Sequence, residues 1–188
     1  MTNFNENGCV LVKGFLDLQA VDTVSRYMEY ALKSKLMERT EDGVATSYSR
    51  YADPLTETIL YNSKEHVEKI TERKLHPTYS YSRVYMKSDA LKPHVDRESC
   101  EISVTVHVAT VGKPWHIWMK PKGSAPISFA LEPGDAVVYK GREVVHWREK
   151  AVDTDLNAQF MLHYVDQNGP YVDYKFDKRA ALGLNNWS

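Results

Sequence analysis

The chain has 188 residues, which at a typical 100–200 residues per domain predicts one domain large enough to bury a core of its own. Hydrophobic residues make up 43% and charged residues 26%, a composition that excludes a disordered chain. The formal net charge of -1, from 24 basic and 25 acidic residues, lacks the basic excess typical of nucleic-acid-binding proteins, so we expect no nucleic-acid partner.

Neither cysteine usage nor hydropathy points to secretion or a membrane. The two cysteines, Cys9 and Cys100, lie far apart and form no CxxC pair and no disulfide framework. The first ten residues contain no basic start and no apolar run, and no apolar stretch approaches the roughly 20 residues of a membrane span. We therefore expect a cytoplasmic protein without a membrane partner, while its oligomeric state stays open.

The first elements in chain order are a strand and a helix. Residues 9–13 form a short apolar run that predicts a strand ending at Gly14. Apolar residues then recur at spacings of three and four over 18–35, which predicts a helix, and Asp17 is a suitable N-cap for it.

The next segment lacks a clear period. Residues 37–61 contain Gly43 and Pro54, and we predict an ordered loop that serves as a lid over a substrate. A second helix is predicted over 62–74, because Asn62 and Glu65 have the spacing of a capping box.

From residue 79 onward the pattern changes to the period of two typical of strands. Turn residues separate the short strands, as at Pro133-Gly134-Asp135. Eight strands in about ninety residues indicate an antiparallel sandwich or barrel, so the fold class is α+β and mainly β, with two helices supporting one sheet. The predicted strands begin at residue 79, continue through the segment that enters His94, and then cover 101–109, 114–120, 126–132, 135–139, 143–148 and 157–165.

Three side chains in this half form a candidate metal site. His94 and Asp96 are two residues apart, and on a strand positions i and i+2 face the same side. His146 lies on a later predicted strand, which can neighbour the first one in a closed sandwich. Two imidazoles and one carboxylate on one face of a metal are the facial triad of non-haem Fe(II) oxygenases.

Four stretches of the chain are similar to one family. The segments are 10–20, 85–96, 131–148 and 157–165, and they include the HxD pair and the distal histidine. Together they resemble the 2-oxoglutarate- and Fe(II)-dependent oxygenases, and within them the small prolyl 4-hydroxylase-like group.

The resemblance implies one domain over 1–188 with a double-stranded β-helix (jelly-roll) core. Helical support would cover 15–76, the core 79–166 and a tail 167–188. It also implies that Fe(II) is bound by His94, Asp96 and His146, with 2-oxoglutarate and O2 as co-substrates. The implied reaction is hydroxylation of an unactivated C–H, of a prolyl residue or of a small metabolite, so the expected partner is a small-molecule or peptide substrate.

This chain lacks the basic residue with which the family pairs the far carboxylate of 2-oxoglutarate. The family has Arg or Lys about ten residues after the distal histidine, where this chain has Leu156. Arg148 is the first candidate, because it lies two residues after His146 and its guanidinium can bind a carboxylate through two nitrogens. A surface ion pair with Glu149 or Asp153 is the alternative for Arg148. Weaker candidates for the cation site are Lys120, Arg83 and Gln159.

Several other residues carry two interpretations. Tyr85 matches the family tyrosine that hydrogen-bonds 2-oxoglutarate, but a core aromatic has the same pattern. Arg97 either contacts substrate or is solvated. His66 and His76 are expected to face solvent, whereas His107, His116 and His163 are expected to pack on strands.

Other functions fit parts of the pattern. A cupin-type metalloenzyme shares the PGD turn and a downstream histidine, but cupins show HxH where this chain has His94-Val95-Asp96. A non-catalytic jelly-roll binding module is the alternative from a different class, and metal content separates it from both enzymes.

Overall fold

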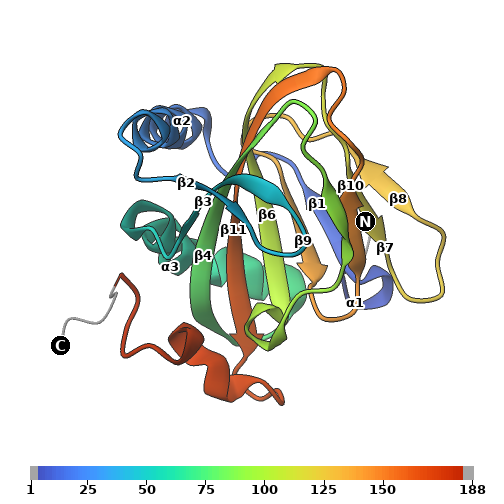
Figure 1. The fold of residues 1–188 in the computed structure, drawn as a ribbon. Helices are drawn as coiled ribbons and strands as arrows, with labels where there is room; N and C mark the ends of the chain where they lie inside the picture. The colour runs from blue at the N-terminus through green and yellow to red at the C-terminus, as the bar shows by residue number, and fades with distance from the viewer. Residues whose placement is uncertain (1–3, 184–188) are drawn as a thin grey trace.

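The computed structural model describes residues 4–183 and is mainly β, with two antiparallel sheets and few helices (Figure 1). The ends of the expected domain over 1–188 and of its tail lie outside the described residues. The strands are β1 Cys9–Val12, β2 Glu38–Glu41, β3 Thr46–Tyr51, β4 Leu75–Met86, β5 Leu91–His94, β6 Ile102–Gly112, β7 Ile117–Lys120, β8 Ile127–Phe129, β9 Ala136–Lys140, β10 Val145–Arg148 and β11 Thr154–Asp166. The larger sheet has the order β1-β9-β6-β11-β4-β3-β2, and the smaller has β5-β10-β7-β8.

The helices cover the outer face of the larger sheet. They are α1 Phe4–Asn7, α2 Leu18–Lys33 and α3 Pro54–Thr71. Two 3-10 turns, η1 Glu98–Cys100 and η2 Val172–Lys178, lie elsewhere. Met28 of α2 and Leu60 of α3 belong to the same buried cluster as Val104 and Phe160 of the sheet. Within residues 4–183, no helix is long and apolar enough to cross a membrane.

Most of the predicted elements are present. The first strand is β1, and the first helix is α2, whose N-cap Asp17 accepts a hydrogen bond from the Ala20 amide. Each predicted strand after residue 79 has a counterpart within a few residues, although β4 already begins at Leu75. The period-two pattern therefore located the strands from β4 to β11.

The prediction of a loop over 37–61 is wrong. Strands β2 and β3 form a hairpin that extends the larger sheet beside β4. Helix α3 begins at Pro54 rather than at residue 62, because Asp53 caps it by accepting from the Leu55 amide and proline suits the first helical position. The capping-box spacing of Asn62 and Glu65 therefore lies inside a helix.

Strand pairing within each sheet brings segments together that are distant in the sequence. Strand β11 pairs with β4 on one side and β6 on the other, which places Gln159 opposite Arg83. In the smaller sheet, β10 pairs with β5, and His146 lies opposite His94. Residues that are 52 positions apart (His94 and His146) and 76 positions apart (Arg83 and Gln159) thus face one another.

Candidate metal centre

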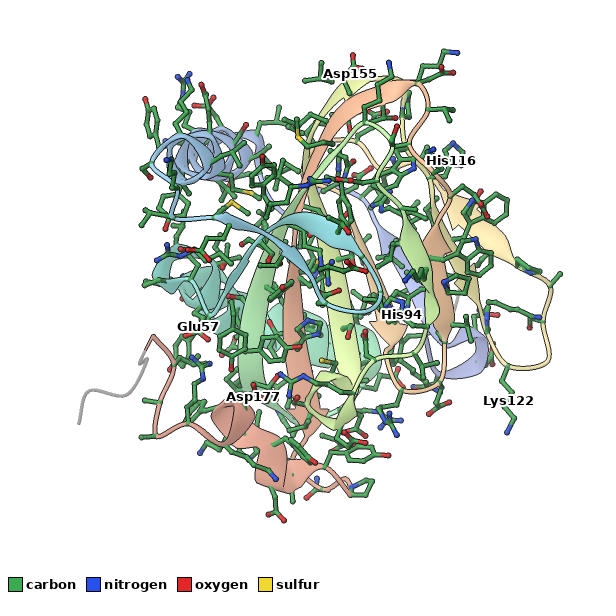
Figure 2. The ribbon with its side chains drawn as sticks, in the orientation of Figure 1. Glu57, His94, His116, Lys122, Asp155 and Asp177 are labelled. Atoms are coloured by element: carbon green, nitrogen blue, oxygen red, sulfur yellow. The ribbon has the colours of Figure 1, made fainter. Side chains whose placement is uncertain are left out.

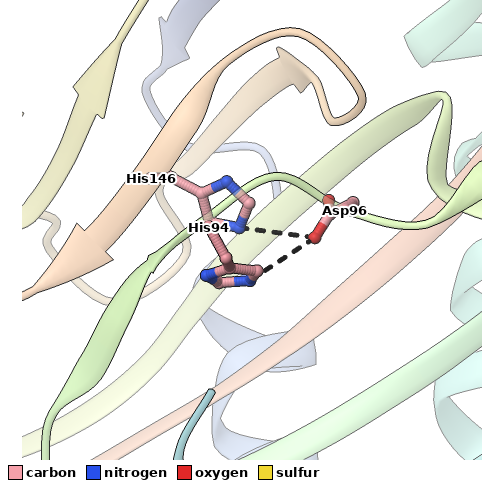
Figure 3. Close-up of side chains that lie close together, drawn as sticks. All are labelled: His94, Asp96 and His146. Carbon is pink, nitrogen blue, oxygen red and sulfur yellow. Dashed lines mark ion pairs between the residues drawn. The ribbon is translucent and has the colours of Figure 1, made fainter. Parts of the chain in front are cut away.

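His94, Asp96 and His146 meet at one point between the sheets (Figure 3). The two imidazole rings have centroids 4.2 Å apart. Asp96 Oδ1 lies 3.7 Å from His94 Nε2 and 3.4 Å from His146 Nε2. Donors bound at about 2.1 Å and at right angles to one another are about 3 Å apart, so a small inward movement of the three atoms accommodates one transition-metal ion.

Asp96 reaches this point from a loop and not from a strand. Strand β5 ends at His94, so the expectation that both residues share one strand face is wrong. Instead, the Asp96 amide donates to the Gly141 carbonyl at 2.8 Å, and Arg142 Nη1 donates to the Asp96 carbonyl at 2.8 Å. These bonds fix the backbone of Asp96 against the turn that precedes β10.

Backbone carbonyls orient both histidines. His94 Nδ1 lies 2.8 Å from the Lys92 carbonyl, and His146 Nδ1 lies 3.1 Å from the Val144 carbonyl. A carbonyl can only accept, so each Nδ1 carries the proton and each Nε2 presents its lone pair. The Nε2 atoms are those that face Asp96, which is the arrangement a metal ligand requires.

A serine and a third histidine support the carboxylate of Asp96. Ser103 Oγ donates to Asp96 Oδ2 at 2.7 Å and lies 3.0 Å from His163 Nδ1. With the Ser103 proton directed at Asp96, His163 donates to the hydroxyl. Burial disfavours the charged carboxylate, but His146 and Ser103 outweigh it and lower the pKa of Asp96 to about 2. Asp96 is therefore ionised, with Oδ1 left for a metal.

The imidazole of His94 is neutral at ordinary pH. Burial, and then the neighbouring His146, lower the pKa of His94 from its usual value. Neutral imidazole nitrogens and a carboxylate are the donors that suit a divalent transition metal.

A second group of donors shares Asp96. Cys100 Sγ and His163 also lie close to this carboxylate. Burial and the charge of Asp96 raise the pKa of the Cys100 thiol, and Tyr79 Oη lies 3.1 Å from its sulfur. A protonated thiol is a poor ligand, so the pair of histidines with Asp96 is the better donor set.

The three residues border a cavity of about 470 Å³. Strand β4 forms one wall, because every second residue from Tyr79 to Tyr85 lines the cavity. The side chains that line it include Tyr79, Tyr81, Arg83, Tyr85, Arg97, Gln159, Met161 and His163. The cavity size is within the range of small-molecule sites.

Arg148 is buried at 2% exposure, so its interpretation as a surface ion pair is wrong. Its Nη2 donates to Gln159 Oε1 at 2.7 Å, and its Nη1 donates to the Trp115 carbonyl. Both partners are neutral, and no carboxylate within residues 4–183 forms an ion pair with Arg148. Its Nε has no hydrogen-bond partner in the described part of the chain. Burial lowers the pKa of Arg148 to about 10, which leaves it charged near pH 7.

The hydroxyl of Tyr85 is also buried without a hydrogen-bond partner among the described residues. Tyr85 is 1% exposed, and it both packs against Trp115 and lines the cavity. A buried hydroxyl without a partner carries a desolvation cost, so it is suited to a ligand group.

The weaker cation candidates have different surroundings. Arg83 lines the cavity, but it is already paired with Asp42 at the tip of the β2–β3 hairpin. Gln159 lines the cavity beside Arg148, whereas Lys120 is exposed at the end of β7.

The remaining histidines mostly match their expected positions. His66 is exposed, and His107 is buried against Thr110. His76 lies on β4 and is partly buried. His116 was expected to pack on a strand, but it is exposed and precedes β7 (Figure 2).

His94, Asp96 and His146 are called the metal cluster below, as candidate ligands of one metal ion. Two of its neighbours, Ser103 and Gly141, were not singled out from the sequence. Their signal was weak, because a strand serine and a turn glycine are common in any sheet. His163 was predicted to pack on its strand, yet the period of two from Gln159 through Met161 could have placed it on the cavity side.

Buried His107 and His163 predict loss of stability in acid. Burial lowers the pKa of each to about 4, below the usual value near 6.5. Between these values the unfolded chain binds protons that the folded chain does not, so stability is complete above about pH 6.5 and falls as the pH falls toward 4. At pH 5 each histidine should lower the free energy of unfolding by about 1–2 kcal/mol.

Urea unfolding at pH 7 and pH 5 measures this effect. His107→Asn, which lies away from the metal cluster, should lose less stability on acidification than the wild-type protein, and exposed His116→Asn is the matched control. An equal loss in all three proteins would rule out this role for His107.

Comparison with solved structures supports the fold. No protein-family model and no curated protein matches the sequence. Among solved structures, the chain is similar to the epimerase SnoN in complex with Fe3+, α-ketoglutarate and nogalamycin RO, with 13% identity, a TM-score of 0.75, and coverage of 97% of this chain and 90% of that one. A 2OG-Fe(II) oxygenase family oxidoreductase from Burkholderia pseudomallei has 18% identity, a TM-score of 0.70, and 89% coverage of both chains.

A third similar structure is a Trichoplax adhaerens prolyl hydroxylase in complex with a hypoxia inducible factor peptide fragment. It has 11% identity, a TM-score of 0.72, and coverage of 88% of this chain and 86% of that chain. The chain thus has the fold of 2-oxoglutarate/Fe(II) oxygenases, including prolyl hydroxylases, as the sequence resemblance implied.

Proposed function

We propose that the protein is a 2-oxoglutarate- and Fe(II)-dependent dioxygenase that hydroxylates an unactivated C–H bond. The observation that carries this proposal is the convergence of His94, Asp96 and His146 at a cavity of about 470 Å³. The charge of Asp96 and the orientation of the two imidazoles by backbone carbonyls fit a divalent iron. The two sheets would then be the halves of a double-stranded β-helix within one domain, supported by the N-terminal helices.

The bound groups would supply the oxidation chemistry, and the protein would hold and orient them. Iron and 2-oxoglutarate, when bound, supply oxidation of a substrate C–H with O2, coupled to decarboxylation of 2-oxoglutarate to succinate and CO2. His94, Asp96 and His146 would hold the metal on one face and leave the opposite face for other ligands. Ser103 keeps one oxygen of Asp96 occupied, so the carboxylate binds through the other.

Arg148 and Tyr85 are the residues that would bind 2-oxoglutarate. The positive charge of Arg148 is buried beside neutral acceptors only, and its Nε and the Tyr85 hydroxyl are both donors without partners in the described chain. Tyr85 lines the cavity and could donate to an anionic carboxylate there directly, whereas Arg148 lies behind Gln159 and would reach that carboxylate once Gln159 moves aside. Gln159, on the strand where the family carries its basic residue, contacts Arg148 directly. The arginine from β10 would therefore substitute for the missing cation of β11.

The substrate is proposed as a small metabolite or a peptidyl proline. The similar structure with a bound peptide fragment supports a peptide, whereas a cavity of this size and enclosure by the tyrosines of β4 support a small molecule. No nucleic acid is proposed, since the net charge is -1.

Turnover without added substrate tests the proposal. The purified protein should slowly convert 2-oxoglutarate to succinate with Fe(II) and O2, and His94→Ala should lower that rate by roughly 100-fold or more through loss of a metal ligand. His116→Ala is the matched control. Stoichiometric metal without 2-oxoglutarate binding would favour a cupin-type enzyme, and absence of metal binding would favour a non-catalytic module.

A further inference from the structure

A second cation, Arg97, lies at the cavity beside the metal cluster. It directly follows Asp96 in the sequence and lines the same cavity. Its guanidinium carbon lies 4.5 Å from the ring centroid of Tyr79, which in turn packs against Tyr51 with ring centroids 5.0 Å apart. Arg97 is therefore held on an aromatic wall within one residue of a metal ligand.

The partner of Arg97 is a carboxylate from outside the two sheets. Asp177 Oδ1 and Oδ2 each accept from one terminal nitrogen of Arg97 at 2.8 Å, and the Tyr51 hydroxyl donates to Oδ2 at 2.6 Å. Asp177 belongs to η2, which packs against β4 at the lower end of the molecule (Figure 2). Three donors, from residues that line the cavity, thus converge on one carboxylate group.

The backbone around Asp177 is in an uncommon conformation. Phe176, Asp177 and Lys178 have φ angles of 53°, 56° and 63°, the left-handed region that non-glycine residues rarely adopt. Such a conformation persists where surrounding contacts hold it, and here the contacts are those of Asp177 with Arg97 and Tyr51. If another carboxylate replaced that of Asp177 on Arg97 and Tyr51, the contacts that hold η2 in this conformation would be lost.

We propose that Arg97 and the Tyr51 hydroxyl, on the wall formed by Tyr79, are a carboxylate-binding subsite for the substrate, and that Asp177 occupies it in the absence of substrate. The substrate class is then a small organic acid whose free carboxylate binds Arg97. Its neighbouring carbons would extend into the cavity toward the metal cluster. This inference rests on the proposed oxygenase function, because it names the substrate of the same cavity.

The test compares acids with their primary amides. The probes are N-acetylglycine, N-acetylproline and N-acetylphenylalanine, each with its amide, titrated calorimetrically into protein that contains Zn(II) and 2-oxoglutarate. At least one acid should bind tenfold or more tightly than its amide. Asp177→Asn should increase the affinity for that acid about fivefold, because it removes the competing negative charge. Arg97→Gln should abolish the preference for the acid.

Hydrogen exchange provides a readout that is independent of turnover. Binding of the acid should increase amide exchange over residues 172–178, and the amide probe should not. Asp153→Asn removes the same charge from an exposed ion pair with Lys113, and it should leave acid binding unchanged. Equal binding of acid and amide in every pair, or weaker acid binding in Asp177→Asn, would show that Arg97–Asp177 is only a structural ion pair.

The two proposals fail separately. If 2-oxoglutarate does not bind to the wild-type protein, the oxygenase proposal fails whatever the acids do. If 2-oxoglutarate binds and no acid is preferred over its amide, only the carboxylate subsite fails.

Discussion

Replacing Arg148 by glutamine is expected to weaken 2-oxoglutarate binding by about 100-fold or more and to leave metal affinity unchanged. Removing one partner of a buried, hydrogen-bonded charge pair typically costs 2–5 kcal/mol, and the lower half of that range already corresponds to this factor. Arg148 does not contact the metal cluster, whose ligands are held by the Lys92, Val144 and Gly141 backbones.

The stability of the ligand-free protein separates a binding role from a structural one. Arg148 is a buried charge without an acidic partner in residues 4–183, so a neutral glutamine should change the melting temperature little. Arg83→Gln is the matched control, because Arg83 lines the cavity but is paired with Asp42. Calorimetric titration of 2-oxoglutarate measures both variants. Loss of binding in Arg83→Gln with normal binding in Arg148→Gln would assign the cation role to Arg83 instead.

Replacing Gly141 by alanine is expected to lower metal affinity by at least roughly tenfold and to destabilise the fold. An alanine Cβ at this position would lie 2.1 Å from the Cys100 carbonyl oxygen, 2.6 Å from Asp96 Oδ2 and 2.7 Å from Ser103 Oγ. All three distances are shorter than any relaxed contact of a Cβ atom. The backbone before β10 and the Asp96 carboxylate therefore cannot both keep their places, and second-sphere changes of this kind typically alter metal affinity 10–100-fold.

Gly123→Ala is the control for the glycine replacement. Its φ of 77° makes alanine strained there, but nothing lies within 4 Å of the new Cβ. It should lose about 1 kcal/mol of stability and keep normal metal affinity. Metal titrations of the two variants measure the difference, and equal affinities would show that the close approach of Gly141 does not position Asp96.

The strands from β4 onward were predictable because they depend on a local pattern, and the three candidate metal ligands were singled out from the HxD pair and the family resemblance. The period of two in the side chains of strands such as β4 and β11 can be recognised from the sequence alone. His94, Asp96 and His146 were singled out before their contacts were known. The reason given for Asp96 was nevertheless wrong, since a hydrogen bond to Gly141 places it rather than a shared strand face.

Other features were missed because their signals were polar or non-local. Strand β2 has the sequence Glu-Arg-Thr-Glu and is fully exposed, so it lacks the apolar alternation of a half-buried strand and forms only through pairing with β3 at the sheet edge. The pairing of Arg97 with Asp177 joins residues 80 positions apart, which no spacing rule anticipates. The burial of Arg148 depends on contacts with β11 and the segment before β7.

The most direct test of the central claim is the absorption spectrum of the anaerobic protein with Fe(II) and 2-oxoglutarate. A metal held by His94, Asp96 and His146 and chelated by 2-oxoglutarate should give a visible charge-transfer band that is absent with either component alone. The band should disappear in His94→Ala and persist in His116→Ala. Absence of the band in the wild-type protein, together with unchanged metal affinity in His94→Ala, would contradict the assignment.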